Sequence, residues 1–258
     1  MSNVKAIVTG ASSGIGRDMA IYLGKLGYDL VLVSRDINRL KETASKIDTN
    51  VEIYTADLSN KESCFKLHDK FKDDDIDLLV NGAGFGLFGD TWETDLNKEM
   101  EMINLNLVAV HILTKLFLQD MIKRDKGRIL NVASSAGFFA GPGLNTYYAT
   151  KNYVVQWTLA IYEELRALKS NVKISCLCPG PVDTNFNKVA GGSFTVKPMK
   201  SDVVAKFGID ACLKNKLICV PGFTTRLILM FTRFLPVKLS LRVIHSIQQK
   251  KKVGNKNA

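Results

Sequence analysis

Short apolar runs alternate with longer amphipathic stretches over most of this chain. Because βαβ units produce such an alternation, it predicts an α/β fold with a mostly parallel, doubly wound sheet and helices on both faces. Several runs are continuously apolar, which is typical of strands covered on both sides. We predict strands over 4–8, 29–33, 51–55, 77–81, 127–132, 172–178 and 217–220, and helices over 15–26, 38–47, 61–72, 97–123, 146–169 and 201–215.

The chain reads as one domain with a tail. No repeat, low-complexity segment or linker interrupts it before about residue 220. We therefore expect a single domain over 1–221 and a basic amphipathic extension over 222–258. Two short helices are expected in this extension, over 225–235 and 237–249, because Pro236 breaks the helical pattern.

Composition restricts the class of protein. Of the 258 residues, 46% are hydrophobic and 23% are charged, as in globular proteins with a full core. No 18-residue apolar run is free of charges, so we expect no membrane-spanning helix. The first apolar run is not preceded by a signal peptide and the five cysteines form no CxxC pair, which predicts a cytoplasmic protein with reduced thiols. Three scattered histidines argue against a metal site or a histidine-based triad.

Charge is distributed unevenly. The net charge is +10, yet residues 197–258 hold 13 Lys or Arg against 2 Asp or Glu, while the preceding residues hold 22 and 23. A basic amphipathic helix pair suits peripheral contact with an anionic membrane surface. It suits equally a lid over the substrate site or an oligomer contact. No nucleic-acid motif accompanies the charge, so we expect no nucleic-acid partner.

Tyr147 and Lys151 are the first candidates for chemistry. Residues four apart in a helix lie on one face, one turn from each other. A free tyrosine has a pKa near ~10, and a fixed cation beside it favours the phenolate and lowers that pKa. The pair is therefore a candidate for proton transfer at neutral pH. Alone it is weak evidence, since Tyr and Lys occur at this spacing by chance on many helices.

A glycine-rich turn follows the first predicted strand. Its pattern is GxxxGxG, which differs from the GxGxxG fingerprint of dinucleotide-binding proteins. The prediction of a dinucleotide-binding turn therefore depends on its position at a strand–helix junction. Glycines there allow a tight turn and close approach of a pyrophosphate to the helix N-terminus. The residues of this candidate phosphate site are Gly10, Ser12, Ser13, Gly14, Ile15 and Gly16.

Three motifs in register resemble the classical short-chain dehydrogenase/reductase family. They are Thr-Gly-x-x-x-Gly-x-Gly at 9–16, Asn-Gly-Ala-Gly at 81–84 and Tyr-x-x-x-Lys at 147–151, and the likeness covers about residues 4–220. The resemblance implies a Rossmann-like sheet of about seven strands and hydride transfer between a nicotinamide cofactor and a carbonyl or alcohol substrate. It also implies a homodimer or homotetramer built on helices 97–123 and 146–169.

The same resemblance assigns four catalytic residues. Ser134 stands 13 residues before Tyr147, and its hydroxyl would hold the substrate oxygen together with the tyrosine. Tyr147 would transfer the proton, while Lys151 would lower the tyrosine pKa and bind the nicotinamide ribose. Asn106 would hold a local helix distortion and a water that relays protons, with Asn104 as the alternative.

Further cofactor contacts follow from the resemblance. Ser34 and Arg35 end the second strand, where Arg accommodates the 2′-phosphate of NADP and an acid would bind the ribose of NAD. We expect NADP(H) rather than NAD(H), although Asp36 follows directly and either competes with Arg35 or orients it. The remaining predicted contacts are Asp57 and Leu58 at the adenine, Asn81, Ala83 and Gly84 after the fourth strand, and Pro179, Gly180, Val182 and Thr184 at the nicotinamide.

Two further expectations concern this region. Residues 183–200 would form a substrate lid, hinged at Gly191 and Gly192. Its apolar contacts would be Phe186, Phe194 and Met199. Gly82 stands where the family usually has asparagine, and we expect it to cost local stability without loss of cofactor binding.

These inferences predict an NADP(H)-dependent oxidoreductase, a carbonyl reductase that interconverts a ketone or aldehyde and an alcohol. A tail that contacts a membrane would indicate a lipophilic substrate. The alternatives are a 3-oxoacyl-thioester reductase and a non-catalytic NADP-binding sensor or scaffold. The complete catalytic set favours an enzyme, since a sensor needs no proton donor. No metal is expected, because proton donation neutralises the developing alkoxide.

Overall fold

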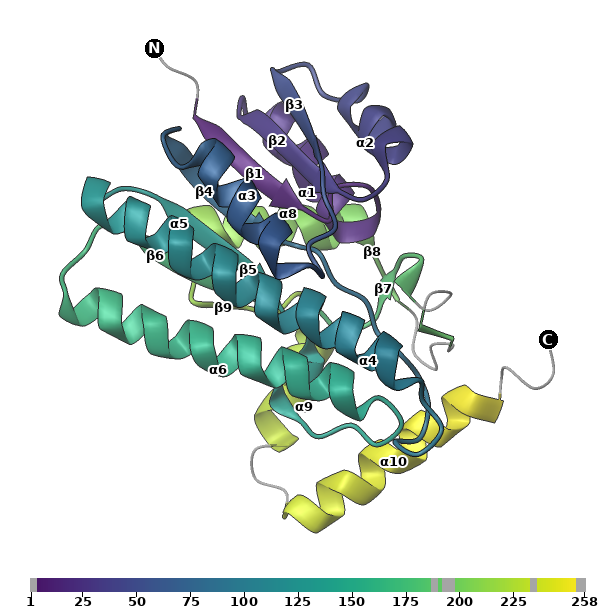
Figure 1. The fold of residues 1–258 in the computed structure, drawn as a ribbon. Helices are drawn as coiled ribbons and strands as arrows, with labels where there is room; N and C mark the ends of the chain where they lie inside the picture. The colour runs from purple at the N-terminus through teal and green to yellow at the C-terminus, as the bar shows by residue number, and fades with distance from the viewer. Residues whose placement is uncertain (1–3, 187–189, 192–197, 233–235, 254–258) are drawn as a thin grey trace.

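A parallel sheet forms the centre of the molecule (Figure 1). In this computed structural model the described residues are 4–186, 190–191, 198–232 and 236–253. They form seven strands of one sheet: β1 (Lys5–Thr9), β2 (Asp29–Ser34), β3 (Val51–Thr55), β4 (Ile76–Asn81), β5 (Arg128–Val132), β6 (Lys173–Leu177) and β9 (Ile218–Cys219). Their order is β3-β2-β1-β4-β5-β6-β9, and all neighbours are parallel. The predicted doubly wound α/β fold is thus confirmed.

Helices cover both faces of the sheet (Figure 1). One face is covered by α1 (Gly14–Lys25), α2 (Ile37–Ala44) and α8 (Ser201–Leu213). The other face is covered by α3 (Lys61–Phe71), α5 (Val110–Arg124) and α6 (Asn145–Ala167). The described residues form one hydrophobic cluster on the first side, and a large and a small cluster on the side of α5 and α6.

The double cover explains why the strands are continuously apolar. Successive side chains of a strand point to opposite faces. In β1, Ala6 and Val8 join the core under α1 and α8, whereas Ile7 joins the core under α3 and α5. The same division recurs in β2 and β5. Both sets of positions are buried, so neither carries the polar residues of a half-exposed strand.

The predicted helix 97–123 is not continuous. It consists of α4 (Leu96–Ile103), a π-helical segment η1 (Asn104–Ala109) and α5. Among the described residues this run, Leu96–Arg124, is the one long and apolar enough for a membrane span by length and composition. In the fold it covers the sheet, with Leu113, Phe117 and Met121 in the core.

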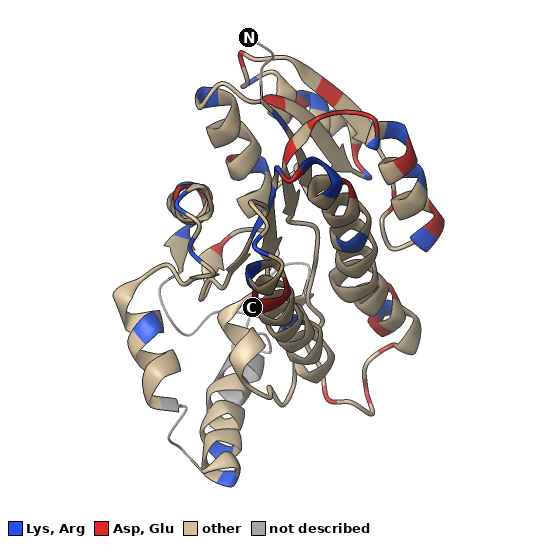
Figure 2. Cartoon of the chain, turned by 90° about the vertical axis from the view of Figure 1, so that its left-hand side faces the viewer, with Lys and Arg blue, Asp and Glu red and all other residues tan. Residues whose placement is uncertain are grey.

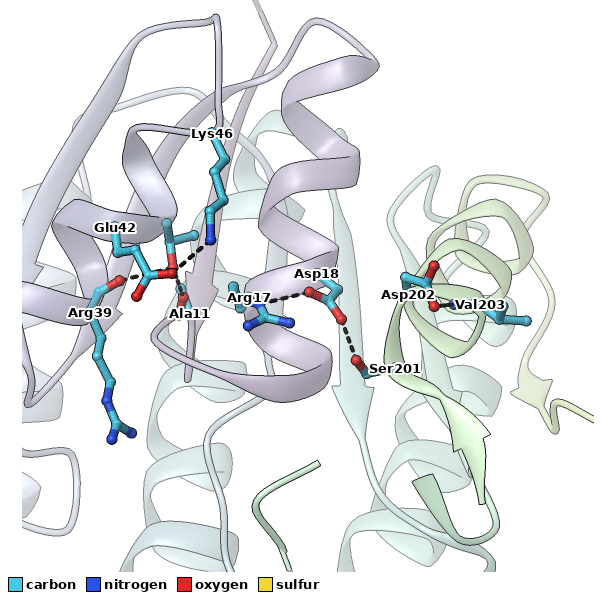
Figure 3. A network of polar contacts seen from close by, with 10 residues as sticks. Ala11, Arg17, Asp18, Arg39, Glu42, Lys46, Ser201, Asp202 and Val203 are labelled. Atoms are coloured by element: carbon cyan, nitrogen blue, oxygen red, sulfur yellow. Dashed lines mark hydrogen bonds and ion pairs between the residues drawn. The ribbon is translucent and has the colours of Figure 1, made fainter. Parts of the chain in front are cut away.

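Polar contacts join α1 to α8 (Figure 3). Asp18 accepts a hydrogen bond from the Ser201 hydroxyl, and the Arg17 Nε lies 2.8 Å from the Asp18 carboxylate. One turn further along α1, the Tyr22 hydroxyl donates to Asp210 at 2.7 Å. A small sheet of β7 (Val182–Asp183) and β8 (Met199–Lys200), which was not predicted, leads into α8. These contacts anchor both ends of segment 183–200.

The tail folds into two helices. They are α9 (Phe223–Thr232) and α10 (Val237–Val253), close to the predicted 225–235 and 237–249, although 233–235 lie outside the described residues. Figure 1 shows α10 across the N-terminal end of α6. There the Gln248 Nε2 donates to the Tyr148 hydroxyl at 2.8 Å.

Candidate active site

A cleft of about 740 Å³ opens at the carboxyl ends of the strands. It lies where the strand order reverses between β1 and β4, the place at which open α/β sheets bind ligands. The structure describes every predicted site residue, and two of them, Asn81 and Asn106, do not line the cleft. The others line it: Gly10, Ser12, Ser13, Gly14, Ile15, Gly16, Ser34, Arg35, Asp57, Leu58, Ala83, Gly84, Ser134, Tyr147, Lys151, Pro179, Gly180, Val182 and Thr184.

The glycine turn is shaped for the close approach of a ligand. Gly10 and Gly14 have positive φ angles of 72° and 54°, which other residues rarely adopt. A Cβ on Gly16 would lie 2.4 Å from the Gly10 carbonyl oxygen. Ser13 precedes α1 without a side-chain cap, so the first N–H groups of the helix keep their capacity to bind an anion. The turn therefore fits the pyrophosphate of a dinucleotide.

Gly16→Ala is expected to weaken dinucleotide binding roughly 10- to 100-fold, because overpacking against backbone costs about 1–3 kcal/mol. The binding of NADPH, followed by its fluorescence, measures the effect. Gly24→Ala in the same helix is the matched control, since its added Cβ would meet the side chain of Ile47 rather than backbone. Unchanged affinity in Gly16→Ala would contradict the assignment of the turn.

Tyr147 and Lys151 occupy one face of α6, as their spacing predicts. The Tyr147 ring lies 5.9 Å from the Lys151 Nζ. Lys151 is 5% exposed and its Nζ donates to the Val132 carbonyl oxygen at 2.9 Å. Burial lowers the pKa of Lys151 to about 8, since removal from water disfavours its charged form.

The expected lowering of the Tyr147 pKa is wrong for this structure. Burial raises the pKa of Tyr147 to about 12, and the hydrogen bond with Ser134 opposes that rise. The Lys151 Nζ donates to the Val132 carbonyl, and the cost of desolvating the Tyr147 phenolate determines the direction of the pKa shift. The Tyr147 phenol therefore carries its proton at neutral pH.

Ser134 lies where β5 leads into a short 3₁₀ helix, Ser135–Phe138, and Ser134 caps that helix. Its hydroxyl accepts from the Ala136 N–H at 3.1 Å and donates to the Pro179 carbonyl at 3.4 Å. The Pro179 carbonyl also accepts from the Ser135 N–H at 2.7 Å. The ends of β5 and β6 are thus fixed to each other, and Ser134 is held against Tyr147.

Asn106 lies in the π-helical segment, so the expected helix distortion is present. Its side chain is fully buried and clamps the backbone of Phe85, accepting from its N–H at 3.0 Å and donating to its carbonyl at 2.8 Å. A Cβ on Gly84 would lie 2.8 Å from the Asn106 Oδ1 and 3.5 Å from the Lys151 Nζ. Asn106 therefore positions the loop that faces Lys151, from behind the cleft wall.

The side chain of Asn81, one of the predicted cofactor contacts, lies away from the cleft. Its side chain is 1% exposed and points into the sheet, where its Nδ2 donates to Thr114 and Asn131, both at 2.9 Å. This amide belongs to a buried network that joins β4, β5 and α5. The neighbouring strand and helix supply partners for the buried Nδ2, whereas the Oδ1 has none among the described residues.

Steric crowding favours glycine at position 82 in this chain. A Cβ there would lie 2.7 Å from the Thr9 carbonyl oxygen. The Thr9 hydroxyl accepts from the N–H groups of Gly82 and Ala83, at 3.0 and 3.2 Å. The turn after β4 is thus drawn close to β1, and the asparagine usual in the family would need the backbone to move.

Charged residues surround the end of β2. The Arg35 Nη1 lies 2.8 Å from Glu101 and 3.7 Å from Asp57. Asp36 caps α2 by accepting from two N–H groups and pairs with Arg39 at 3.3 Å, so it does not orient Arg35. Ser34, Arg35, Asp36 and Arg39 all line the cleft at this strand end, with the Asp36 carboxylate engaged by α2 and by Arg39.

The segment expected to form a lid begins beside Tyr147. The Phe186 ring lies 5.2 Å from the Tyr147 ring, and a Cβ on Gly86 would lie 2.5 Å from Phe186. Met199 packs instead against the hydrophobic core. Phe194 and the hinge residue at 192 lie outside the described residues.

Sequence reasoning missed three residues at this site. Glu101 contacts Arg35 across 66 positions, and Gln248 contacts Tyr148 across 100. Thr150 accepts from the Asn106 amide at 3.4 Å and donates to the Tyr147 carbonyl at 2.7 Å. Only Thr150 carried a signal, its place within the Tyr-x-x-x-Lys motif. In the part of the chain that the structure describes, no three His, Cys, Asp or Glu side chains gather to hold a metal.

Comparison with known proteins agrees with this geometry. A family model described as short chain dehydrogenase matches residues 4–191. Estradiol 17-beta-dehydrogenase 11 of Homo sapiens is 33% identical over 222 residues, which cover 84% of this chain and 74% of the relative. A short-chain dehydrogenase from Sphingobium yanoikuyae in complex with NADPH has a TM-score of 0.81 at 26% identity, covering 89% of this chain and 93% of that one. A short chain dehydrogenase/reductase from Burkholderia phymatum in complex with NAD has a TM-score of 0.80 at 25% identity, covering 88% and 92%.

The chain therefore belongs to the short-chain dehydrogenase/reductase family, in its classical form. It is an oxidoreductase of that family, acting on CH–OH groups with a nicotinamide dinucleotide.

Proposed function

We propose that the chain is an NADP(H)-dependent carbonyl reductase that interconverts a ketone or aldehyde and the corresponding alcohol. The observation that carries this proposal is that Ser134, Tyr147 and Lys151 line the same cleft as the glycine turn. A sensor or scaffold would need the turn alone. The combination supports turnover at this site.

Proton transfer from Tyr147 is the contribution of the protein to the chemistry. A nicotinamide dinucleotide, when bound, supplies the hydride for reduction or accepts it for oxidation. The Ser134 and Tyr147 hydroxyls, hydrogen-bonded to each other, hold the substrate oxygen. Because burial raises the pKa of Tyr147 to about 12, the phenol carries its proton at neutral pH. An alkoxide is more basic than a phenolate, so the proton passes from Tyr147 to that oxygen.

Lys151 and Asn106 act behind Tyr147. The buried ammonium of Lys151 stabilises the phenolate that remains after proton transfer. Asn106 fixes the loop opposite Lys151 through its two hydrogen bonds to Phe85. In this proposal a water beside Asn106 returns the proton to the site, and Lys151 also binds the nicotinamide ribose.

NADP(H) is the proposed cofactor. Arg35 is more than half exposed within the cleft lining, and Ser34 adjoins it. The nearest acid in sequence, Asp36, also lines the cleft, but its carboxylate already caps α2 and pairs with Arg39. Glu101 and Asp57 hold Arg35 in place and compete with a 2′-phosphate for its guanidinium. These contacts make Arg35 and Glu101 opposing determinants of cofactor preference.

Arg35→Ala is expected to weaken NADPH binding roughly 10- to 100-fold and to leave NADH binding unchanged, because a charge-assisted hydrogen bond contributes about 1.5–3 kcal/mol. Glu101→Gln should instead strengthen NADPH binding by up to about fivefold, since an exposed ion pair contributes at most about 1 kcal/mol. Titration of each variant with both cofactors measures the ratio. An equal loss of NADPH and NADH affinity in Arg35→Ala would contradict the proposed preference.

A lipophilic ketone is the proposed substrate. Phe85, Leu87, Phe88, Leu144 and Phe186 line the cleft with Tyr147. The relative estradiol 17-beta-dehydrogenase 11 carries a steroid in its name. The test is NADPH oxidation by the full chain with small aliphatic, bulky aromatic and steroid ketones and a 3-oxoacyl thioester. Turnover favouring the bulky ketones is expected. Bound NADPH without turnover on any of them would favour a sensor.

Assembly and location complete the proposal. We infer a homodimer or homotetramer through α5 and α6, because His111 stacks on Trp157 at 4.3 Å beside Tyr153 on partly exposed surface. Sedimentation velocity of the purified chain tests this.

The five cysteines are free and buried, which suits the cytoplasm.

A further inference from the structure

Large apolar side chains are exposed along α9. They are Phe223, Ile228, Met230 and Phe231, which are 50–73% exposed. On the opposite side of this helix Leu229 packs against the core under β6. Exposed single apolar residues are ordinary, but four large ones within nine positions form a contiguous patch of the kind that marks an interaction site.

The neighbouring helix α10 has two distinct faces. Its inner face contacts the body of the protein, where Leu241 adjoins a cavity of about 390 Å³ beside Tyr148 and Gln248 is 5% exposed. The apolar residues of its outer face are 44–47% exposed and recur at every fourth position, which places them in one stripe along the helix. They are Leu239, Val243 and Ile247.

Positive charge accompanies this apolar surface, and negative charge is absent from the sequence there. Residues 222–258 contain eight Lys or Arg and no Asp or Glu. Lys238 and Arg242 are exposed on α10, and Figure 2 shows basic residues without acidic ones on the described parts of both helices. Apolar residues flanked by Lys and Arg on one amphipathic helix are typical of helices that lie in the interface of anionic membranes.

We propose that α9 and α10 form a docking surface for an anionic lipid bilayer. The exposed apolar side chains enter the boundary between headgroups and acyl chains, and Lys238 and Arg242 face the headgroups. A second copy of the chain fits this surface less well. An isologous contact would bring together two segments with eight positive charges each and no acidic residue to compensate them.

The docking surface adjoins the mouth of the active site. Tyr148 lines the catalytic cleft and accepts the hydrogen bond from Gln248 of α10. The N-terminal end of α9 is equally close, since a Cβ on Gly180 of the cleft would lie 3.0 Å from the Thr225 hydroxyl. A chain bound through α9 and α10 therefore holds its cleft near the lipid, where a lipophilic substrate is concentrated. This last step rests on the proposed function, whereas bilayer docking does not.

Co-sedimentation of the full chain with vesicles tests the docking surface. Vesicles of equal parts phosphatidylglycerol and phosphatidylcholine are compared with phosphatidylcholine alone, at low and high salt. We expect binding to the anionic vesicles that weakens with salt, and binding at least about tenfold weaker to phosphatidylcholine. Lys238→Glu/Arg242→Glu should lower binding by at least about 25-fold. Phe223→Ser/Phe231→Ser/Val243→Ser should lower it by at least about tenfold.

Matched controls change the same residue types elsewhere on the surface. Lys61→Glu/Lys66→Glu makes the same charge change on α3, and Ile37→Ser/Phe65→Ser removes exposed apolar side chains from α2 and α3. Both should bind vesicles as the parent does, and a thermal melt of each variant verifies folding. Absence of parent binding at low salt overturns the proposal. So does equal loss in the controls, or a change in oligomeric state of the α9–α10 variants without vesicle binding, which would assign the surface to a second copy.

Discussion

Tyr147→Phe is expected to lower kcat by about 10²–10⁴-fold and to leave NADPH affinity within about twofold. The variant keeps the ring beside Phe186 and removes the hydroxyl that hydrogen-bonds Ser134. The loss should therefore fall on kcat, because proton donation occurs in the reaction step. Steady-state NADPH oxidation gives kcat, and fluorescence titration gives the affinity.

Tyr162→Phe is the matched control for this prediction. It makes the same chemical change on the same helix, at an exposed position away from the cleft. It should retain the activity of the parent. A Tyr147→Phe variant with more than about a tenth of the parent kcat would remove Tyr147 from its role.

Lys151→Met should abolish most activity and, below pH 8, stabilise the fold. Lowering the lysine pKa from 10.5 to about 8 corresponds to a charging cost of about 3 kcal/mol. Loss of the hydrogen bond to the Val132 carbonyl lowers the free energy of unfolding by about 1 kcal/mol, which leaves a net stabilisation on the order of 2 kcal/mol. Activity should fall because the phenolate left by Tyr147 loses its buried cation.

The stability difference between Lys151→Met and the parent depends on pH. Between pH 8 and about 10.5 the unfolded chain binds more protons at Lys151 than the folded chain does, so the stability of the parent rises with pH. The advantage of Lys151→Met is therefore full below pH 8 and disappears toward pH 10.5. Urea unfolding of both proteins at pH 7 and pH 10 measures it. A variant less stable than the parent at pH 7 would contradict the burial cost.

The sheet was predictable because its information is local. Continuously apolar strands that alternate with helices indicate a sheet covered by helices on both faces. Ala6 and Val8 pack in one core and Ile7 packs in the other, as this pattern predicts. Strands as short as β7 and β8 have no such period. Ser134, Tyr147 and Lys151 were found because motif spacing fixes where they stand at the ends of β5 and α6.

The remaining features depend on contacts between distant parts of the chain. Glu101 of α4 contacts Arg35 after β2, and no pattern near either residue predicts that pair. Asn81 belongs to the right motif, but Thr114 and Asn131 turn its amide into the core. The predicted direction of the Tyr147 pKa shift was wrong. The sequence shows the lysine cation beside the phenol, but it does not show how far both groups are removed from water.

In the proposed reaction a carbonyl carbon bound in this cleft receives hydride from the nicotinamide while Tyr147 protonates the oxygen. The most direct measurement is reduction of a bulky ketone by the full chain with NADPH deuterated at the reactive carbon of the nicotinamide, followed by mass spectrometry of the alcohol. We expect one deuterium on the former carbonyl carbon, placed on a single face, and none detectable over the same time with Tyr147→Phe. NADPH consumed without deuterium in the alcohol, or label transfer undiminished in Tyr147→Phe, would contradict it.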